Sequence, residues 1–286
     1  MSPAPRPALT LVWLLLWSGV SACSVVPLSD LRPDGFGVDG ISAESEALGR
    51  AVLAQAAEAH GGATWGEHQT WQTVLEDRWS KDWLIARRSP WPDDVTMLQL
   101  QFSPGTSNGR VEFLDGSIKG TAWGFAEGRT YAQAPGEAPV WDEAPRMASR
   151  LPTMQFLLEF PQQITRAQFV GHIGQRQVDG HTTEVVFASW GSIAPDPTFD
   201  QFLVYVDTES HHILAMQYTV RKSGRTLLGH RFWSDLRTSD GVLLPFFQTS
   251  LHDFEDGDPV HSFIVSDFSF DTVSAESLAD PDQSRD

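Results

Sequence analysis

The sequence predicts a mainly β protein of the α+β class, in which one antiparallel sheet is accompanied by a few helices. Short runs of alternating apolar and polar residues recur along the chain, whereas helical spacing occurs in two stretches. Two-residue turn signals separate these runs: Asp115-Gly116, Glu127-Gly128, Asp179-Gly180, Ser223-Gly224, Asp240-Gly241 and Asp256-Gly257. Each places a glycine where a hairpin needs positive φ, and so many short returns imply antiparallel meanders rather than βαβ crossovers.

The first 22 residues have the features of a secretion signal. Arg6 precedes an uninterrupted apolar stretch at residues 8–17. This stretch is shorter than the roughly 20 residues that a membrane-spanning helix needs, and it fits the apolar core of a signal peptide. The next residues, Val20-Ser21-Ala22-Cys23, resemble the lipobox of bacterial lipoprotein precursors.

The lipobox resemblance implies that Cys23 becomes the first residue of the mature chain and carries diacylglycerol, usually with an amide-linked acyl chain. Two or three acyl chains, at ~0.8 kcal/mol per buried CH₂, give stable attachment to a membrane without a spanning segment. Ser24 is similar to the residue that Gram-negative sorting rules allow to travel to the outer membrane. We therefore expect a lipid-anchored envelope protein on the periplasmic face of that membrane; the alternative is an ordinary cleaved signal with Cys23 incidental.

The exported part begins with a tether and a helix. Residues 23–41 mix Pro, Gly and Asp with little periodicity, which favours a flexible or extended tether, although a partly docked arm is also compatible. Residues 42–60 are alanine-rich with helical spacing, Ser42 is a possible N-cap and Gly61-Gly62 is the stop. This segment is predicted to be a helix.

Strands follow from residue 71 onward, and one helix interrupts them. Trp71, Thr73 and Leu75 alternate with polar residues, as do the apolar residues at 98–102. Residues 144–160 have helical spacing, with a possible break at Pro152 and an end at Pro161. Later strands are predicted near 165–177, 181–190, 201–207, 212–221, 226–238, 242–252 and 260–270.

Residues 42–273 are therefore predicted to form a single domain, followed by a polar tail, 274–286, that we expect to fray. A sheet of this many strands must curl or close to protect its edges. The apolar inner face of a curled sheet must then be filled by side chains, helices or a ligand.

Several short motifs resemble the LolA/LolB-like superfamily of bacterial envelope proteins. They are His60-Gly61-Gly62 at the helix end, Gln168-Phe169-Val170-Gly171, Val178-Asp179-Gly180-His181, residues 202–207 (FLVYVD) and Asp240-Gly241-Val242-Leu243-Leu244-Pro245. The resemblance covers roughly residues 45–271. It implies a strongly curved, unclosed antiparallel sheet, with an N-terminal and a mid-chain helix over its concave side and a hydrophobic cavity between them. Members of this superfamily carry or receive acyl chains of lipoproteins, or have no assigned role.

Composition narrows the possible functions. The formal net charge of −17 repels nucleic-acid phosphates, so we expect no nucleic-acid partner. The single cysteine excludes an intramolecular disulfide, a zinc cluster of cysteines and a two-thiol redox site. The sequence holds no G-x-S-x-G or H-E-x-x-H motif and no glycine-rich phosphate loop. We therefore predict a non-catalytic protein without metal or cofactor. An uncharacterised hydrolase is kept only as a third functional hypothesis, after the two that follow.

The leading functional hypothesis is binding of a lipid or a lipoprotein acyl chain in the concave cavity. Aromatic and aliphatic side chains can line such a cavity, although tryptophan in half-buried strands is more often ordinary packing. The candidate ligand-binding residues are Trp71, Trp79, Trp123, Phe156, Leu157 and Phe160. The segment 156–160 is equally a filler of the cavity and a lid. The alternative is an envelope scaffold lipoprotein that contacts a protein partner and fills its cavity with its own side chains.

Overall fold

The computed structural model describes residues 27–34, 36, 40–81, 89–222, 224–255 and 257–282. Within these ranges, thirteen strands form one antiparallel sheet in the order β6-β5-β4-β3-β2-β1-β13-β12-β11-β10-β9-β8-β7. The strands are β1 (Trp71–Trp79), β2 (Val95–Phe102), β3 (Gly109–Phe113), β4 (Ala122–Ala126), β5 (Arg129–Gln133), β6 (Val140–Trp141), β7 (Phe169–Val178), β8 (His181–Ser189), β9 (Gln201–Asp207), β10 (Ile213–Thr219), β11 (Leu228–Ser239), β12 (Val242–Leu251) and β13 (Pro259–Phe270). The predicted α+β class with an antiparallel meander is confirmed.

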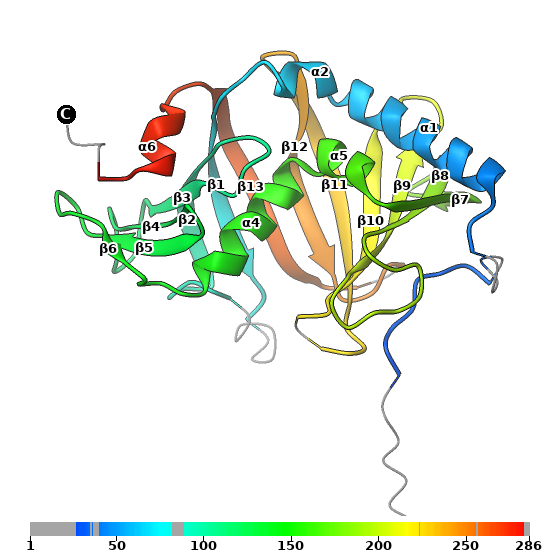
Figure 1. Cartoon of the computed structure of the whole chain (residues 1–286), viewed down its shortest axis with the longest axis horizontal. Helices are drawn as coiled ribbons and strands as arrows, with labels where there is room; N and C mark the ends of the chain where they lie inside the picture. The colour runs from blue at the N-terminus through cyan, green and yellow to red at the C-terminus, as the bar shows by residue number, and fades with distance from the viewer. Residues whose placement is uncertain are drawn as a thin grey trace, which may run out of the picture.

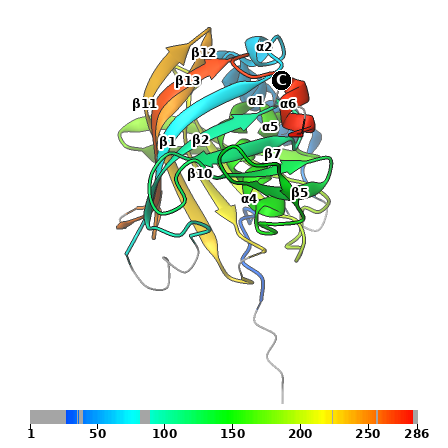
Figure 2. The ribbon, with the colours of Figure 1, turned by 90° about the vertical axis from the view of Figure 1, so that its left-hand side faces the viewer.

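One long-range pairing joins the two groups of strands. β1 pairs with β13 along its whole length, from Trp71 opposite Phe270 to Trp79 opposite His261. All other neighbours in the sheet are also neighbours in the sequence. β6 and β7 are the two ends of the strand order, so the sheet is curved and unclosed, as expected (Figure 1, Figure 2).

Helices gather on the concave side of the sheet (Figure 2). α1 (Ala43–Ala59) packs along β7 and β8, and α2 (Gly62–Trp65) follows it. The Ser42 side chain accepts a hydrogen bond from the Ser45 amide, so α1 begins where the sequence predicted. Between β6 and β7 the chain crosses the concave side as α4 (Met147–Leu158), α5 (Phe160–Gln163) and the 3₁₀ turn η1 (Ile164–Arg166) (Figure 1). No helix of the described residues is long and apolar enough to traverse a bilayer.

The prediction that Pro161 ends the mid-chain helix is wrong. α4 runs through Pro152 and ends at Leu158, and Pro161 lies in the first turn of α5. A proline fits there because the first N–H groups of a helix have no intrahelical acceptor. The strand expected from residue 165 accordingly begins only at Phe169, after η1.

Both ends of the described chain are more ordered than predicted. Residues 275–279 form α6 (Ala275–Ala279), capped by the Ser274 side chain, and Leu278 is buried. The expected frayed tail is therefore wrong for this segment, where one apolar side chain and one cap are enough for a short docked helix. At the other end, residues 27–34, called the arm below, contact the domain, as the docked-arm alternative proposed.

Three of the turn signals form the predicted tight hairpins. Both central residues have positive φ at Glu127-Gly128, Asp179-Gly180 and Asp240-Gly241, as a two-residue type I′ turn requires. Gly116 also has positive φ, but it lies in a longer connection between β3 and β4. Gly224 and Gly257 do not have positive φ, so the positive-φ interpretation of those two signals is wrong.

His60, which follows α1, joins that helix to β10 and β12 at the end of the sheet where these two strands begin. Its Nδ1 donates to the Leu243 carbonyl at 3.0 Å, and its Nε2 accepts from the Ile213 amide at 3.1 Å. The side chain is fully buried, and this burial lowers the pKa of His60 to about 4. The fold therefore requires the neutral imidazole.

We predict that protonation of His60 weakens the fold as pH falls. The folded-state pKa lies below the ordinary value of 6.5, so the stabilisation is complete above about pH 6.5 and is lost as pH falls towards 4. The full loss is about 3 kcal/mol for a shift of this size. His60→Gln should be less stable than the natural chain near neutral pH, and urea unfolding should show that the difference narrows as pH falls. A difference that stays constant or widens would contradict the neutral buried imidazole.

Candidate functional site

The concave face of the sheet is an aromatic core closed by α4 and α5. Trp71 packs against Phe102 and Phe268 with ring centroids 4.9 and 5.7 Å apart. Phe160 contacts Trp233 at 5.4 Å from the helical side. Trp71 and Phe160 are fully buried, so the helices and the sheet share one packed interior.

All six predicted ligand-binding residues lie in or against this core. Trp71, Leu157 and Phe160 are buried members of it, and Trp79, Trp123 and Phe156 pack against it while partly exposed. Phe156 contacts Phe160, Trp190 and Phe202 with centroids 5.4 to 6.0 Å apart. The structure thus brings the six together, and their contact with a ligand stays a prediction. Cys23, the predicted lipid attachment site, lies outside the described residues.

A buried carboxylate fastens the covering helices to the sheet. Glu159, between α4 and α5, is only 2% exposed. Its Oε1 accepts from Trp71 Nε1 and from Gln155 Nε2, each at 2.8 Å, and its Oε2 accepts from Gln163 Nε2 at 2.7 Å. Gln155 Nε2 also donates to the Ser103 carbonyl at 2.9 Å. This network orients α4 and α5 on β1 and on the end of β2, and no local pattern in the sequence predicts it.

A second polar group lies at the opposite end of the same face. Asp77 accepts from Trp91 Nε1 at 2.8 Å and from His261 Nε2 at 2.7 Å. Arg231 donates from Nη2 to His261 Nδ1 at 3.1 Å and from Nη1 to Gln248 at 2.9 Å. This series of hydrogen bonds, from the Asp77 carboxylate to the Arg231 guanidinium, joins β1, β13 and β11. Burial lowers the pKa of the Arg231 guanidinium.

A row of four side chains crosses neighbouring strands on the inner face and is called the polar row. It consists of Trp79, His261, Ser250 and Arg231. The register places Trp79 opposite His261, His261 opposite Ser250, and Ser250 opposite Arg231. Trp79 and His261 stack with ring centroids 4.0 Å apart. The polar row marks the end of the sheet where β1 and β12 end and β11 and β13 begin, called the lower rim below (Figure 1).

Polarity therefore changes along the strands of the inner face. On β12 the inward residues are apolar at Val242, Leu244 and Phe246, and then polar at Gln248 and Ser250 towards the lower rim. β13 follows the same course, from buried phenylalanines near its end to His261 near its start. The concave face is thus amphipathic along its length, with its polar end at the lower rim.

The polar end holds several buried donors that have no acceptor among the described residues. They are Arg231 Nε, Gln248 Nε2 and Trp79 Nε1, and the Ser250 hydroxyl is likewise unpartnered. A buried polar group without a partner costs about 1–3 kcal/mol, so each donor favours an acceptor brought from outside. Phosphate, carboxylate and ester oxygens supply such acceptors.

Asp77, His261 and Ser250 lie on adjacent strands, but their hydrogen bonds do not form a nucleophilic triad. The carboxylate can only accept and the guanidinium can only donate, so His261 is the neutral tautomer with its proton on Nε2. Burial lowers the pKa of His261, in agreement with this form. Its one lone pair is engaged by Arg231, and it therefore cannot take a proton from Ser250.

The convex face carries a separate hollow of about 580 Å³. Phe254 packs there over Tyr205 and Phe232, with ring centroids 4.8 and 5.1 Å away. Arg176 and Gln217 contribute polar groups to the lining. Val204 and Val206 point into the aromatic core, and Tyr205 between them points to the opposite face of the sheet. The sheet therefore separates this hollow from the aromatic core.

Comparison with solved structures identifies the fold. A putative outer membrane lipoprotein-sorting protein domain from Vibrio parahaemolyticus is similar at a TM-score of 0.54 and 14% identity, over 82% of this chain and 97% of that one. A LolA superfamily protein from Nitrosomonas europaea is similar at a TM-score of 0.50 and 14% identity, over 80% and 96%. No model of a known protein family and no curated protein matches the sequence. The fold is therefore LolA-like, as the sequence motifs suggested.

We predict that Glu159 is required to hold the covering helices in place. Glu159→Ala leaves Trp71 Nε1 and Gln163 Nε2 without an acceptor and removes one of the two acceptors of Gln155 Nε2, so it should lower the free energy of unfolding by about 3 kcal/mol or more. Glu159→Gln keeps an acceptor oxygen at the same position and should cost clearly less. Urea unfolding followed by tryptophan fluorescence measures both variants, and equal small losses would show that the network does not support α4 and α5.

Proposed function

We propose that this chain is an exported, lipid-anchored protein that binds one amphiphilic ligand on its concave face and catalyses no reaction. The observation that carries the proposal is the set of unpartnered buried donors at the polar end of a largely apolar face. A lipid, or the acylated end of a lipoprotein, combines an apolar chain with the oxygen acceptors that these donors lack. The ligand class follows from this combination.

The apolar chain would occupy space that α4 now fills. Phe156 and Leu157 lie on α4, and Phe156 is only partly buried, so this helix face is the part of the core that can be exchanged for a ligand. Burying an acyl chain gains about 0.8 kcal/mol per CH₂, which offsets the apolar packing that α4 gives up when it moves. We infer that α4 acts as a lid and that the Glu159 network holds its end when the cavity is empty.

The location in the envelope rests on two supports. The lipobox-like sequence at Cys23 provides the attachment point. The LolA-like fold is shared with a structure named as an outer membrane lipoprotein-sorting domain. Together they favour the periplasmic face of the outer membrane of a Gram-negative bacterium.

A second candidate function is an envelope scaffold whose cavity is filled by its own side chains. The complete burial of Trp71 and Phe160 beneath the helices favours this alternative. A scaffold would need a protein partner, which crosslinking in intact cells would capture. The two functions differ in whether the isolated domain carries a ligand.

We predict that residues 24–286, purified from cells, bring an amphiphile that organic extraction and mass spectrometry detect. Arg231→Met should reduce the bound amount about tenfold or more, because a charge-assisted hydrogen bond of about 1.5–3 kcal/mol is lost. Arg78→Met is the control, since Arg78 is exposed on β1, alternates with inward-facing Asp77 and pairs with Glu76. It should retain the ligand. An empty natural domain that binds no acyl chain would reject the carrier function and leave the scaffold.

We predict that Cys23 is acylated after export. Cells grown with a fatty-acid analogue should label the natural chain, and Cys23→Ser should be unlabelled and move from the membrane to the soluble envelope fraction. Ser24→Asp serves as a control that keeps the thiol, so it should remain labelled. Labelling that survives the loss of the thiol would refute the anchor.

A further inference from the structure

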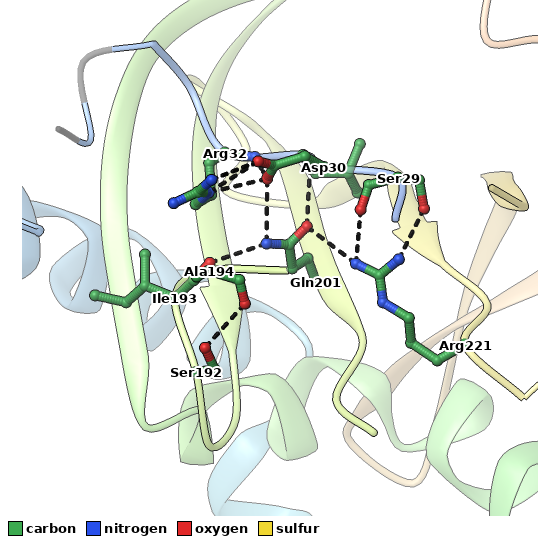
Figure 3. A network of polar contacts seen from close by, with 9 residues as sticks. Ser29, Asp30, Arg32, Ser192, Ile193, Ala194, Gln201 and Arg221 are labelled. Atoms are coloured by element: carbon green, nitrogen blue, oxygen red, sulfur yellow. Dashed lines mark hydrogen bonds and ion pairs between the residues drawn. The ribbon is translucent and has the colours of Figure 1, made fainter. Parts of the chain in front are cut away.

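The arm is seated at the lower rim, between the loop that joins β8 to β9 and the loop that joins β10 to β11 (Figure 3). Two buried side chains of the domain hold it: Gln201 is fully buried and Arg221 is 8% exposed. Polar side chains this deeply buried need hydrogen-bond partners, and the arm provides partners for both of them.

Arg221 grips the arm through its main chain. Its Nη2 donates to the Ser29 carbonyl at 2.7 Å, and its Nη1 donates to the Ser29 hydroxyl at 2.9 Å (Figure 3). The Ser29 amide in turn donates to the Arg225 carbonyl at 2.8 Å. The amide of Arg221 itself is fixed by Asp200 Oδ1 at 2.8 Å, so the grip is part of the folded sheet.

Gln201 provides the second grip. Its Oε1 accepts from the Leu31 amide at 2.9 Å, and its Nε2 donates to Asp30 Oδ1 at 3.3 Å and to the Ile193 carbonyl at 2.9 Å. One amide therefore ties the arm to the loop that joins β8 to β9. Arm, loop and strand end form one connected unit (Figure 3).

This seating sets the length of the tether. From Pro27, the first described residue, to Cys23 the chain covers four residues, which reach at most about 14 Å. If the arm were free, the tether would extend to the start of α1 at Ala43 and would let the domain turn in any direction. The hydrogen bonds of Arg221 and Gln201 to the arm restrict this rotation of the domain.

We propose that the seated arm holds the lower rim against the membrane surface, so that the polar end of the concave face lies next to the lipid head groups. The proposal rests on the lipid anchor at Cys23. The rim is suited to this contact, because Lys222 is exposed in the loop beside the arm and Phe199 is 38% exposed in the other loop. The ammonium group of Lys222 can pair with a lipid phosphate.

Hydrogen exchange on vesicles tests this orientation. The mature chain, residues 23–286, is coupled through its single thiol to maleimide lipid in phosphatidylcholine vesicles. Backbone amides at residues 192–200 and 220–227 should exchange severalfold more slowly than in the uncoupled chain. Amides around the Asp240-Gly241 turn, at the far end of β11, should not change.

A longer tether tests whether tether length determines the orientation, without a change in the folded domain. About 20 Gly and Ser residues placed between Val25 and Val26 leave every described contact in place and extend the tether by roughly 25 Å on average. The rim protection should then be lost. Protection that persists with the longer tether, or appears equally at Asp240-Gly241, would overturn the proposal. Because the coupling is chemical, this result does not depend on acylation in cells, which the metabolic labelling tests by itself.

Discussion

The inner face of the sheet is apolar over most of its area, and an open sheet cannot by itself keep that face away from water. β6 and β7 end the strand order without pairing to each other, so the gap between them has to be covered from the concave side. The chain does this with the segment that links these two edges, α4, α5 and η1. Each large apolar side chain that becomes buried gains about 1.5–3 kcal/mol, so the connection between the edges also closes the core.

Glu159 and Arg231 are both buried in that core, and they differ in how many of their polar atoms have hydrogen-bond partners. Both oxygens of Glu159 accept hydrogen bonds from neutral donors, and all of its partners are fixed in helices or strands. Arg231 is equally buried, but its Nε and the neighbouring Gln248 Nε2 have no acceptor in the described parts of the chain. The first arrangement is complete as a structural element. The second is complete only when something else supplies oxygen atoms, which is why we assign ligand recognition to the polar end.

The sequence predicted most of the strands because their signal is local. Alternation within a strand and glycine at positive φ in turns such as Asp179-Gly180 depend on neighbouring residues only.

The role of Pro161 was mistaken because proline both follows the end of a helix and occupies the first turn of the next one. α6 was missed because five residues with one buried leucine carry almost no periodicity. The candidate site was only partly predictable for a related reason: Asp77 is far in the sequence from Arg231 and His261, and only the pairing of the first strand with the last brings it to them. The seated arm was undecided in the sequence because the side chains that hold it are equally remote from it.

The direction of the inner face and the position of the arm agree with each other. The polar row lies at the lower rim, and the arm leaves the domain at the same rim. An acyl chain that entered from a membrane on this side would pass tail first into the apolar part, and its head group would stop at the unpartnered donors of Arg231 and Gln248. With the opposite orientation, a charged head group would have to cross the aromatic core around Trp71 and Phe268, where burial of an unpaired charge is strongly unfavourable. The position of the arm and the polarity of the strands therefore favour the same entry side for the proposed ligand.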